Sequence, residues 1–595
     1  MKSVIRIISF TLAGLLLVYG SLFSLASPST IDRNLNLTTL IAPPTNEVVI
    51  ASAIEIDAAT FQDNLALYQN DDPGSVVVIY VTVQMGNAAD QTNHTWRELN
   101  DFTHWSFQNS IEAASVARGA AIVQFGDENG PRPGEPGYGV FVPNATIQVR
   151  ASPTSPTAQQ SYKIELRNSA GLWRNQSTLV LNKHNSDLSR ARQKLNFDLM
   201  KKIPDMVSMR TQFVHLYVKD ETADPPESAF VDYGLYTQIE QPNRRFLENH
   251  QLDRDGQLYK AVLFDFQRYP DQIRMVQDPL YDAVTFSSVL EIKGDLNHVK
   301  LIQMLNDLND YSVPIEQTFN KYFDADNYFT WLAYNILTGN VSTENTNFYL
   351  YSPKNGAKWY FIPWDHDASF PLRSWGKAGS FQIAEWQVGV SNYWRVVLHN
   401  RVLRVEEYRQ LLDNKVKQLL SFLAPDRISE MLSAYKSVTD VYVSKLPDQY
   451  YLPGSLEEYE EIYERLPDDI QENYRLYLQS LEKPMPFNLR TPQLSTDGLT
   501  LNWEPAYDFK SDEITYHVQV SSVWTFDSVI YDETVVNLTS LKTGPLEPGE
   551  YFWRVIATNK LGKTQLPFDA YVDVDGGVHQ GIRQFFVAPD GQVLE

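Results

Sequence analysis

The hydrophobic and polar positions of residues 324–339 predict a helix. Asp324 and Asp326 are of a residue type that caps helices, and Gly339 is of the type that ends them. Between them apolar side chains recur at intervals of three and four residues, which is the spacing of one helix face. These apolar positions are Phe329, Leu332, Ala333, Ile336 and Leu337. The pattern therefore predicts a helix that stops at Gly339.

A hairpin that ends in carboxylates is predicted to follow this helix. After the polar loop NVSTENT, residues 347–351 and 358–362 are rich in aromatic and aliphatic side chains, and the residues between them include Gly356. This arrangement is typical of two antiparallel strands joined by a turn. The second strand ends at Pro363, and Asp365 and Asp367 come just after it. The loop and both carboxylates are therefore expected at one edge of the hairpin.

Elsewhere before residue 482 the periodicity indicates a mixture of strands and helices. Alternating patterns predict strands at residues 76–84, 145–150, 161–166, 211–219 and 230–241, and helical spacing covers residues 187–203 and 394–481. Asp187 is a possible cap for the first of these helices. The charged helices after residue 394 are expected to support the hairpin. The fold class is therefore α+β up to this point.

The chain changes character after residues 483–486, which read KPMP. Short alternating strands separated by turn signals then predict an all-β sandwich over residues 487–595. The placement of Trp503, Tyr516 and the Pro548-Gly549 turn resembles a fibronectin type III module. Such modules bind partners or act as spacers. We assign this segment no chemistry.

The first residues are expected to direct the chain out of the cell. Lys2 and Arg6 precede an apolar, uncharged run, and Ser24-Leu25-Ala26 is a small-residue cleavage signal. Residues 1–26 therefore predict a signal peptide, although the same run could remain as a single membrane anchor. Residues 27–52 read as a linker. The predicted location is secreted or at the cell surface, with no membrane association unless the leader is retained.

Composition excludes several kinds of chemistry. The chain of 595 residues has no cysteine, which rules out disulfides, thiolate metal sites and cysteine nucleophiles. Its net charge of −23 opposes binding to nucleic acid and to anionic membrane surfaces. The apolar fraction of 43% is enough for packed cores throughout. The sequence therefore predicts a globular protein whose cores alone hold it together.

The central segment has the same order of elements as the catalytic centre of a protein kinase. In kinases the loop after the helix carries an Asp and, five residues later, an Asn that binds magnesium, and an Asp after the hairpin holds the metal that bridges the phosphates. Asn347, Asp365 and Asp367 fit the metal-binding positions, and Ser342 stands five residues before Asn347. Asp-His-Asp after a strand could equally bind calcium or simply end the strand in solvent.

The surrounding residues resemble the CotH kinase family, atypical secreted kinase-like proteins named for a spore coat protein. Members carry a block close to GN-x-D-x-x-x-x-N-x-YLY followed by PWD-x-D, and this chain reads GNVSTENTNFYLY and FIPWDHD. Further blocks, including GLYTQIEQ, place the resemblance over about residues 76–480. It implies a two-lobed kinase-like fold with residues 53–300 as a β-rich lobe and residues 301–482 as the lobe that carries the loop and hairpin.

The resemblance also implies ligands and roles. ATP with Mg²⁺ or Mn²⁺ would be bound, and the family's substrate class is protein serine. Asp365 and Asn347 would position the metal, assisted by Asp367. Arg150 remains from the family's phosphate-side loop, and Glu240 would contact the nucleotide or a cation near it. An equally strong alternative makes Glu240 the cap of the helix that follows.

Three positions depart from the family. Ser342 stands where the loop Asp is expected, Gln160 replaces a Lys, and Ala151 replaces a Gly. A serine hydroxyl cannot accept a proton as a carboxylate can, and a neutral amide cannot hold phosphate as an ammonium can. Glu344 is a second possible carboxylate for the loop. These changes weaken the predicted transfer step.

Three functions therefore remain open. The first is an active atypical kinase with a protein substrate. The second is a non-catalytic pseudokinase, an extracellular scaffold or binding protein with a partner in a spore coat or at the cell surface. A carbohydrate-binding protein is a third, since the chain is rich in aromatic residues, although Tyr and Trp on strands usually belong to the core.

Overall fold

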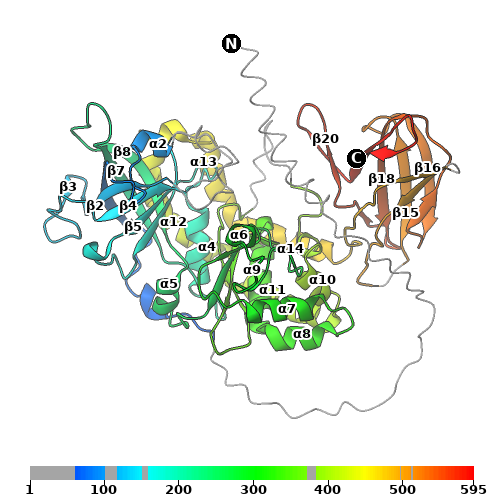
Figure 1. Cartoon of the computed structure of the whole chain (residues 1–595), viewed down its shortest axis with the longest axis horizontal. Coiled ribbons are helices and arrows are strands. Elements are labelled where there is room, and N and C mark those ends of the chain that lie inside the picture. Colours follow the sequence, from blue (N-terminus) through cyan, green and yellow to red (C-terminus); the bar gives the residue numbers. More distant parts are fainter. Residues whose placement is uncertain are drawn as a thin grey trace, which may run out of the picture. The chain divides into compact units, whose positions relative to one another are not determined.

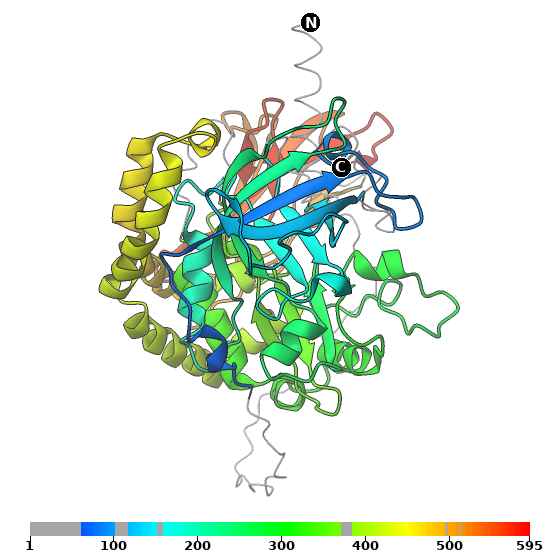
Figure 2. The ribbon, with the colours of Figure 1, turned by 90° about the vertical axis from the view of Figure 1, so that its left-hand side faces the viewer.

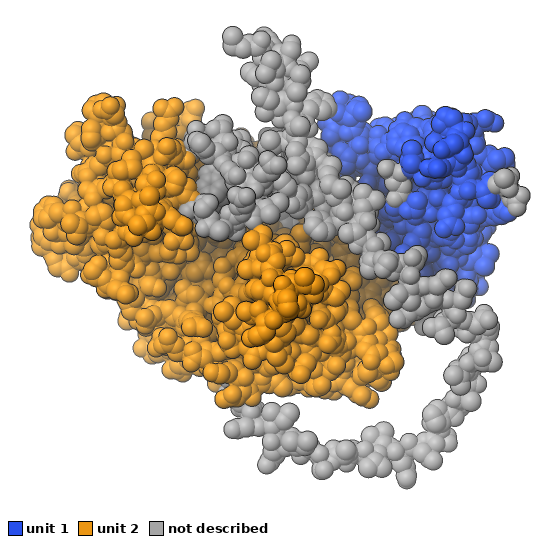
Figure 3. Space-filling view, viewed as in Figure 1, with its two compact units in different colours: residues 1–60, 486–506, 513–595 blue, residues 61–485, 507–512 orange. Residues whose placement is uncertain are grey.

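The computed structural model describes residues 61–100, 117–150, 159–370, 383–495, 498–510 and 513–594. Contacts divide the chain into two units (Figure 3): one holds residues 61–485 with 507–512, and the other holds residues 486–506 and 513–595. The predicted leader, the linker and Ala151 lie outside the described residues.

The first unit is built on a large sheet. Its neighbouring strands are antiparallel, except for β1 and β7, which are parallel. Its strands run in the order β1-β7-β8-β6-β5-β4-β2-β3, and β1 also pairs with β2, so that seven of them close into a ring. The apolar sides of these strands form one core cluster. Figure 1 shows the labelled strands gathered at one end of the unit. The strands are β1 (Val76–Gln84), β2 (Gly119–Asp127), β3 (Gly130–Pro131), β4 (Ala145–Val149), β5 (Tyr162–Leu166), β6 (Thr178–Asn182), β7 (Thr211–Asp220) and β8 (Val231–Glu240).

The predicted hairpin is present as part of a second sheet. Strand β11 (Phe348–Ser352) pairs antiparallel with β12 (Tyr360–Pro363), which confirms the hairpin predicted from the sequence. The sheet continues through β9 (Gln257–Ala261) to β10 (Leu290–Ile292). The last two strands come from the range that the sequence assigned to the β-rich lobe. They join the hairpin because β9 pairs along β11, a contact that no local pattern encodes.

The predicted central helix, α9 (Ala325–Thr338), lies behind the hairpin. Asp324 caps it by accepting a hydrogen bond from the Asn327 backbone N–H at 2.9 Å, and Gly339 ends it with φ of 62°. Every residue from Asn327 to Thr338 is buried. The helix therefore forms the centre of this half of the unit rather than an amphipathic layer on its surface.

Further helices surround α9 and the ring of strands. Helix α12 packs on α4 and β8, and Figure 2 shows it along one flank of the strands. Helix α4 covers only part of the range predicted from the sequence, residues 187–203. It begins at Arg192, and Asp187 lies in the loop before it. The helices are α2 (Trp96–Asn100), α4 (Arg192–Met200), α5 (Arg244–Asn249), α6 (Ala283–Ser287), α7 (Val299–Asn309), α8 (Ile315–Tyr322), α9, α10 (Val397–Leu403), α11 (Glu406–Phe422), α12 (Pro425–Val443), α13 (Leu456–Arg465) and α14 (Asp469–Ser480), with short 3₁₀ turns η1 (Leu65–Tyr68), η4 (Val341–Thr343) and η7 (Asp448–Tyr451).

The second unit is all-β in its described residues, consistent with the fibronectin type III-like module. Trp503 and Tyr516 pack in its core. Its main sheet runs β16-β15-β18-β22-β23, beside a smaller sheet β13-β14-β17. The strands are β13 (Gln493–Ser495), β14 (Gly498–Asn502), β15 (Thr515–Ser521), β16 (Val529–Val536), β17 (Ser540–Lys542), β18 (Gly549–Thr558), β19 (Thr564–Gln565), β20 (Ala570–Val572), β21 (Val578–Gln580), β22 (Ile582–Val587) and β23 (Val593–Leu594).

Two further observations bear on the sequence predictions. None of the helices in the described ranges has the length and apolar character needed to cross a bilayer. Trp331, Trp359, Trp364 and Trp553 are among the largest fully buried side chains. These four tryptophans therefore belong to the cores and offer no surface to a carbohydrate.

The central position of α9 predicts a large stability cost for a cavity within it. Leu332 is fully buried, so Leu332→Ala should lower the free energy of unfolding by about 2–5 kcal/mol. Leu411 on α11 is 43% exposed, so Leu411→Ala should cost less than about 0.5 kcal/mol. Denaturant unfolding followed by tryptophan fluorescence measures both, and equal losses would contradict the central role of α9.

Candidate functional site

The open end of the β11–β12 hairpin holds two of the predicted site residues. Phe348 pairs with Pro363, so Asn347 lies just beyond one side of the last pair and Asp365 just beyond the other. Both have a left-handed backbone, with φ of 58° for Asn347 and 56° for Asp365. Asn and Asp tolerate this conformation better than other residues with side chains. The chain can therefore turn sharply here on both sides of the hairpin.

A chain of hydrogen bonds joins the loop to the residues after β12. Asn347 Nδ2 donates to Ser342 Oγ at 3.2 Å, and Ser342 Oγ donates to Asn340 Oδ1 at 3.2 Å. Asn340 Nδ2 in turn contacts His366 Nδ1 at 3.0 Å and the Asp365 carbonyl oxygen at 3.5 Å. Asn340 is fully buried and was not predicted as a site residue. In the sequence, the position of Asn340 directly after Gly339, which ends the helix, was the feature that could have marked it as a candidate site residue.

The two predicted metal-binding carboxylates have no partner of their own. Among the described residues, the side chains of Asp365 and Asp367 form no hydrogen bond or ion pair with another residue, and Asp367 accepts only its own backbone N–H. Burial and the nearby carboxylates of Asp365 and Asp187 raise the pKa of Asp367 to about 8, against the opposing charge of Arg150. Neighbouring acidic groups of this kind suit a bound cation, and the Asn347 amide oxygen would be available as a third ligand.

This set lacks a complete ligand cage. Nowhere in the described ranges do three or more His, Asp or Glu side chains gather closely enough to hold a metal ion. Magnesium usually retains several waters and takes only one or two protein carboxylates together with substrate phosphates. Asp365, Asp367 and Asn347 therefore fit a cation that arrives with a phosphate ligand better than one bound by protein alone.

Helix α4 supports the carboxylate loop from behind. Asn196 Nδ2 donates to Ser369 Oγ at 2.6 Å and to the His366 carbonyl at 3.3 Å. Arg192 Nε donates to the Phe370 carbonyl at 3.4 Å, and Nη1 of the same residue pairs with Asp187 at 2.5 Å. Arg192 is fully buried and its Nη2 has no hydrogen-bond partner.

Asp187 was predicted only as a helix cap, and the structure gives it a second position in the site. It does accept the Arg192 backbone N–H at 3.0 Å, as a residue before the helix can. Its carboxylate is also near enough to act on Asp367. Asp187 is fully ion-paired with Arg192, which lowers its pKa against the effect of burial. Sequence reasoning missed the position of Asp187 beside Asp367 because these two residues are far apart in the sequence.

The predicted phosphate-side residues lie only partly within the described chain. The Arg150 guanidinium lies over the Trp364 ring at 5.1 Å and acts on Asp367, so the structure does bring Arg150 to the carboxylates. The Gln160 carbonyl accepts a hydrogen bond from the Tyr236 hydroxyl at 3.2 Å. The loop between these two residues, which includes Ala151, is not described.

Lys183, at the end of β6, does not replace the ammonium missing at position 160. Its Nζ contacts Asp448 at 2.9 Å and the carbonyls of Tyr233 and Leu235 at 2.8 and 3.1 Å. Burial lowers its pKa to about 8 against the opposing effect of Asp448. An ammonium has three protons to donate, so these contacts use all of them.

Glu240 has a structural role instead of the predicted nucleotide contact. It is 1% exposed, and its two oxygens accept bonds from Arg210, Asn249 and His250. Neither oxygen remains for a ligand. The alternative, a cap for α5, is also corrected, because Asn243 accepts the first backbone N–H groups of that helix.

Glu344 follows η4 and faces a different segment from the carboxylates after β12. Burial raises its pKa to about 7, and the opposing charge is Arg395. Its Oε2 is buried without a hydrogen-bond partner. The hydroxyl of Tyr393 is bonded to the neighbouring Thr343 at 3.1 Å. Glu344 thus lies among residues 393–395.

A comparison with protein families identifies the chain. The model described as CotH kinase protein matches residues 147–477, more than half of the sequence. The match includes every predicted site residue from Arg150 to Asp367. The chain belongs to the CotH kinase family. No curated protein matches the sequence.

The Glu240 network predicts how stability changes with pH. The carboxylates of Glu240 and Asp63 raise the pKa of the buried His250 to about 9, against burial. The stabilisation from charged His250 is complete below its unfolded pKa of about 6.5 and is lost as the pH rises through about 9. The free energy of unfolding should therefore fall across this window, by at most about 1.4 kcal/mol per pH unit from this group.

The control is His250→Gln, which keeps hydrogen-bonding atoms but cannot gain a proton. Denaturant unfolding at pH 6.5, 7.5, 8.5 and 9.5 should show a smaller decline in the variant than in the parent. Parallel declines would assign the pH dependence to other groups.

Proposed function

We propose that this chain is a nucleotide-binding pseudokinase: it binds ATP with Mg²⁺ or Mn²⁺ at the open end of the β11–β12 hairpin but transfers the γ-phosphoryl group poorly. The observation that carries the proposal is the contrast between the two halves of the site. Within the described part of the chain, the metal-side carboxylates Asp365 and Asp367 bond to no other residue, whereas Ser342 occupies the position of the family's loop Asp.

The ligand atoms support the binding half of the proposal. Asp365, Asp367 and the Asn347 amide oxygen would hold the cation, which when bound neutralises phosphate charge. Arg150 lies on the side of Asp367 and is the residue in place to meet a phosphate. A cation would also relieve the repulsion between the neighbouring carboxylates.

The hydrogen bonds of Ser342 support the part of the proposal that says phosphoryl transfer is poor. In transfer, the acceptor hydroxyl of a protein serine forms a bond to the γ-phosphorus, the bond from that phosphorus to ADP breaks, and the hydroxyl proton passes to a base. Ser342 Oγ accepts from Asn347 and donates to Asn340, so it is committed to two amides and is not a base at neutral pH. The chain also has Gln160 in place of the phosphate-side ammonium.

One observation favours the alternative of an active kinase. Glu344 is in the same loop and carries a buried, unpartnered oxygen with a raised pKa. Its surroundings, Arg395 and Tyr393, argue against this role. The experiments below separate the two functions.

The cellular setting is part of the proposal. The predicted leader and the CotH family together support a secreted or cell-surface protein, in a spore coat or cell envelope. The fibronectin type III-like unit would supply contacts to a protein partner there.

If the chain binds ATP together with a divalent metal ion, the two added together should raise the temperature of unfolding. ATP with Mg²⁺ or Mn²⁺ should raise the unfolding midpoint more than either component alone, because a ligand that binds only the folded state stabilises it by about 2.7 kcal/mol at a concentration 100 times its Kd. Asp365→Asn should abolish the joint effect. Asp271→Asn, at a side chain that is 82% exposed, is the matched control and should leave it unchanged. No shift at millimolar ligand would remove the nucleotide from the proposal.

Restoring the loop carboxylate should restore transfer. Ser342→Asp is expected to raise phosphate incorporation from γ-labelled ATP into the protein itself or a casein substrate by about 10²-fold or more, the usual contribution of a general base. Ser342→Asn has similar size but cannot accept the proton, so it should give no gain. Rapid transfer by the parent that Glu344→Gln abolishes would show instead that the chain is an active kinase using Glu344.

A further inference from the structure

A cavity of about 850 Å³ lies on the side of α4 that faces away from the carboxylate loop. Its walls come from η1 with the chain around it, from α4 and the loop after it, from the start of β7, and from α12. Asn196 and Arg192 of the same helix hold the backbone of His366 and Phe370. The cavity is therefore separate from the candidate nucleotide site, and α4 lies between the two.

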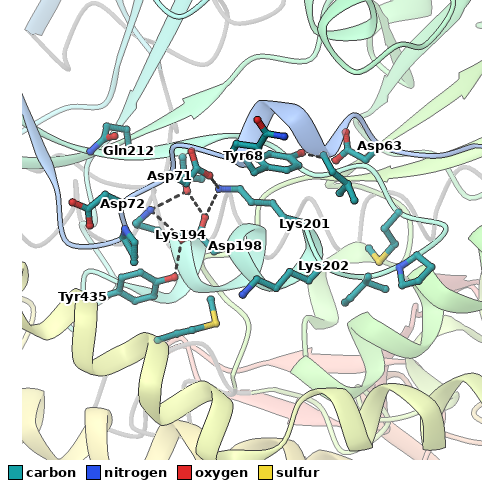
Figure 4. Close-up of a pocket in the computed structure, with 18 of the residues that line it drawn as sticks. Asp63, Tyr68, Asp71, Asp72, Lys194, Asp198, Lys201, Lys202, Gln212 and Tyr435 are labelled. Atoms are coloured by element: carbon teal, nitrogen blue, oxygen red, sulfur yellow. Dashed lines mark hydrogen bonds and ion pairs between the residues drawn. The ribbon is translucent and has the colours of Figure 1, made fainter.

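Four of the charged groups in the cavity wall form ion pairs with one another. Asp198 pairs with Lys194 at 3.0 Å and with Lys201 at 2.6 Å, and it also accepts from the Tyr435 hydroxyl at 2.7 Å. Lys201 pairs further with Asp71 at 2.7 Å. Figure 4 shows these groups joined in one network. This wall is therefore preformed and does not call for an ion as ligand.

The remaining lining combines apolar side chains with polar ones such as Gln69 and Gln212. Leu65 contributes to the wall although it is 64% exposed, and Ile203, Met206 and Met431 line the same space. Lys202 lines the cavity as an exposed residue, and within the described ranges its side chain has no hydrogen bond or ion pair. Asp72 lines the cavity as well, and its Oδ1 accepts a hydrogen bond from the Gly74 N–H at 3.0 Å. The apolar side chains and the Lys202 ammonium together can therefore accept an apolar segment that carries a carboxylate next to Lys202.

The chain itself supplies such a ligand a few residues away. Residues 47–57 read EVVIASAIEID, with apolar Val and Ile residues, three carboxylates and no cation. In an extended conformation Ile54 and Ile56 share one face, and Glu55 and Asp57 share the other. This pattern would place isoleucines in the cavity and carboxylates toward Lys202.

The attachment point makes docking within one chain favourable. Gln62 and Asp63 line the cavity, and Phe61 is buried against Tyr360 with ring centroids 4.4 Å apart. The eight residues from Ile54 to Gln62 can span up to about 26–29 Å. A short tether of this kind gives an effective concentration in the millimolar range, so even a weak contact would be occupied.

We propose that the cavity behind α4 is a docking site for residues 47–57 of this same chain. Ile54 and Ile56 fill the apolar part, and Glu55 or Asp57 pairs with Lys202. The docked segment packs against the face of α4 opposite to the one that holds the carboxylate loop. This inference does not depend on nucleotide binding.

Because the chain has no cysteine, engineered cysteine pairs give a direct test in the full-length protein. Ile50→Cys, Ile54→Cys and Ile56→Cys are each combined with Met431→Cys in the cavity, so that one register error does not hide a contact. The control combines each with Leu411→Cys, which is exposed on α11. Circular dichroism checks that each variant folds, and mass spectrometry after mild oxidation measures the rate of intramolecular disulfide formation.

At least one Met431 pair should crosslink roughly tenfold or more faster than its Leu411 control, and denaturant should remove the difference. Adding Lys202→Glu should slow that pair, whereas Lys354→Glu, an exposed charge in the hairpin turn, should not. Equal rates for all pairs would overturn the proposal. So would predominant disulfide-linked dimers, which would identify the occupant as a segment of a second copy.

Discussion

The candidate site depends on the side chain of one buried asparagine. Helix α9 ends at the left-handed Gly339, and this turn directs Asn340 toward the residues after β12. Its amide nitrogen contacts His366 and the Asp365 carbonyl, and its amide oxygen accepts from Ser342. The loop and the carboxylate strand end are thereby held in register. Without this link, strand pairing would still bring Asn347 near Asp365, but Ser342 would lose its connection to the residues after β12.

Helix α4 shows how charge can be buried in the centre of a protein when every group is paired. All of its residues are buried, including Arg192, Lys194 and Asp198. A buried charge without a partner costs several kcal/mol, and here each has an opposite charge within 3.0 Å. One face of the helix holds the backbone beside the carboxylates, and the other forms the wall of a cavity. The Arg192–Asp187 pair serves the first face, and the pairs of Asp198 with Lys194 and Lys201 serve the second.

In the proposed pseudokinase, one part of a phosphoryl-transfer centre would be lost while another is kept. Positioning of a metal needs carboxylates without competing partners, which Asp365 and Asp367 retain. Proton removal needs a base of suitable pKa in contact with the acceptor, and Ser342 supplies only a hydroxyl that is already bonded. Family membership by itself therefore does not establish catalysis, since a fold can keep its ligand site after losing one reactive group.

The sequence by itself determined the elements whose signals are local. Helix α9, its cap Asp324, its terminating Gly339 and the β11–β12 hairpin all follow from periodicity and turn residues within a short stretch. The same holds for strand β1 and for the all-β character of the last unit. Asp365 and Asn347 were placed correctly at the hairpin end because strand pairing alone brings them there.

Only the tertiary structure decided which distant residues became partners. Glu240 proved to be enclosed by Arg210 and His250, and β9 joined the hairpin sheet. Lys183 is neutralised by Asp448, 265 positions away in the chain. The physical reason is that burial and ion pairing depend on which surfaces meet when the chain closes, whereas helix, strand and turn patterns are set by neighbours along it.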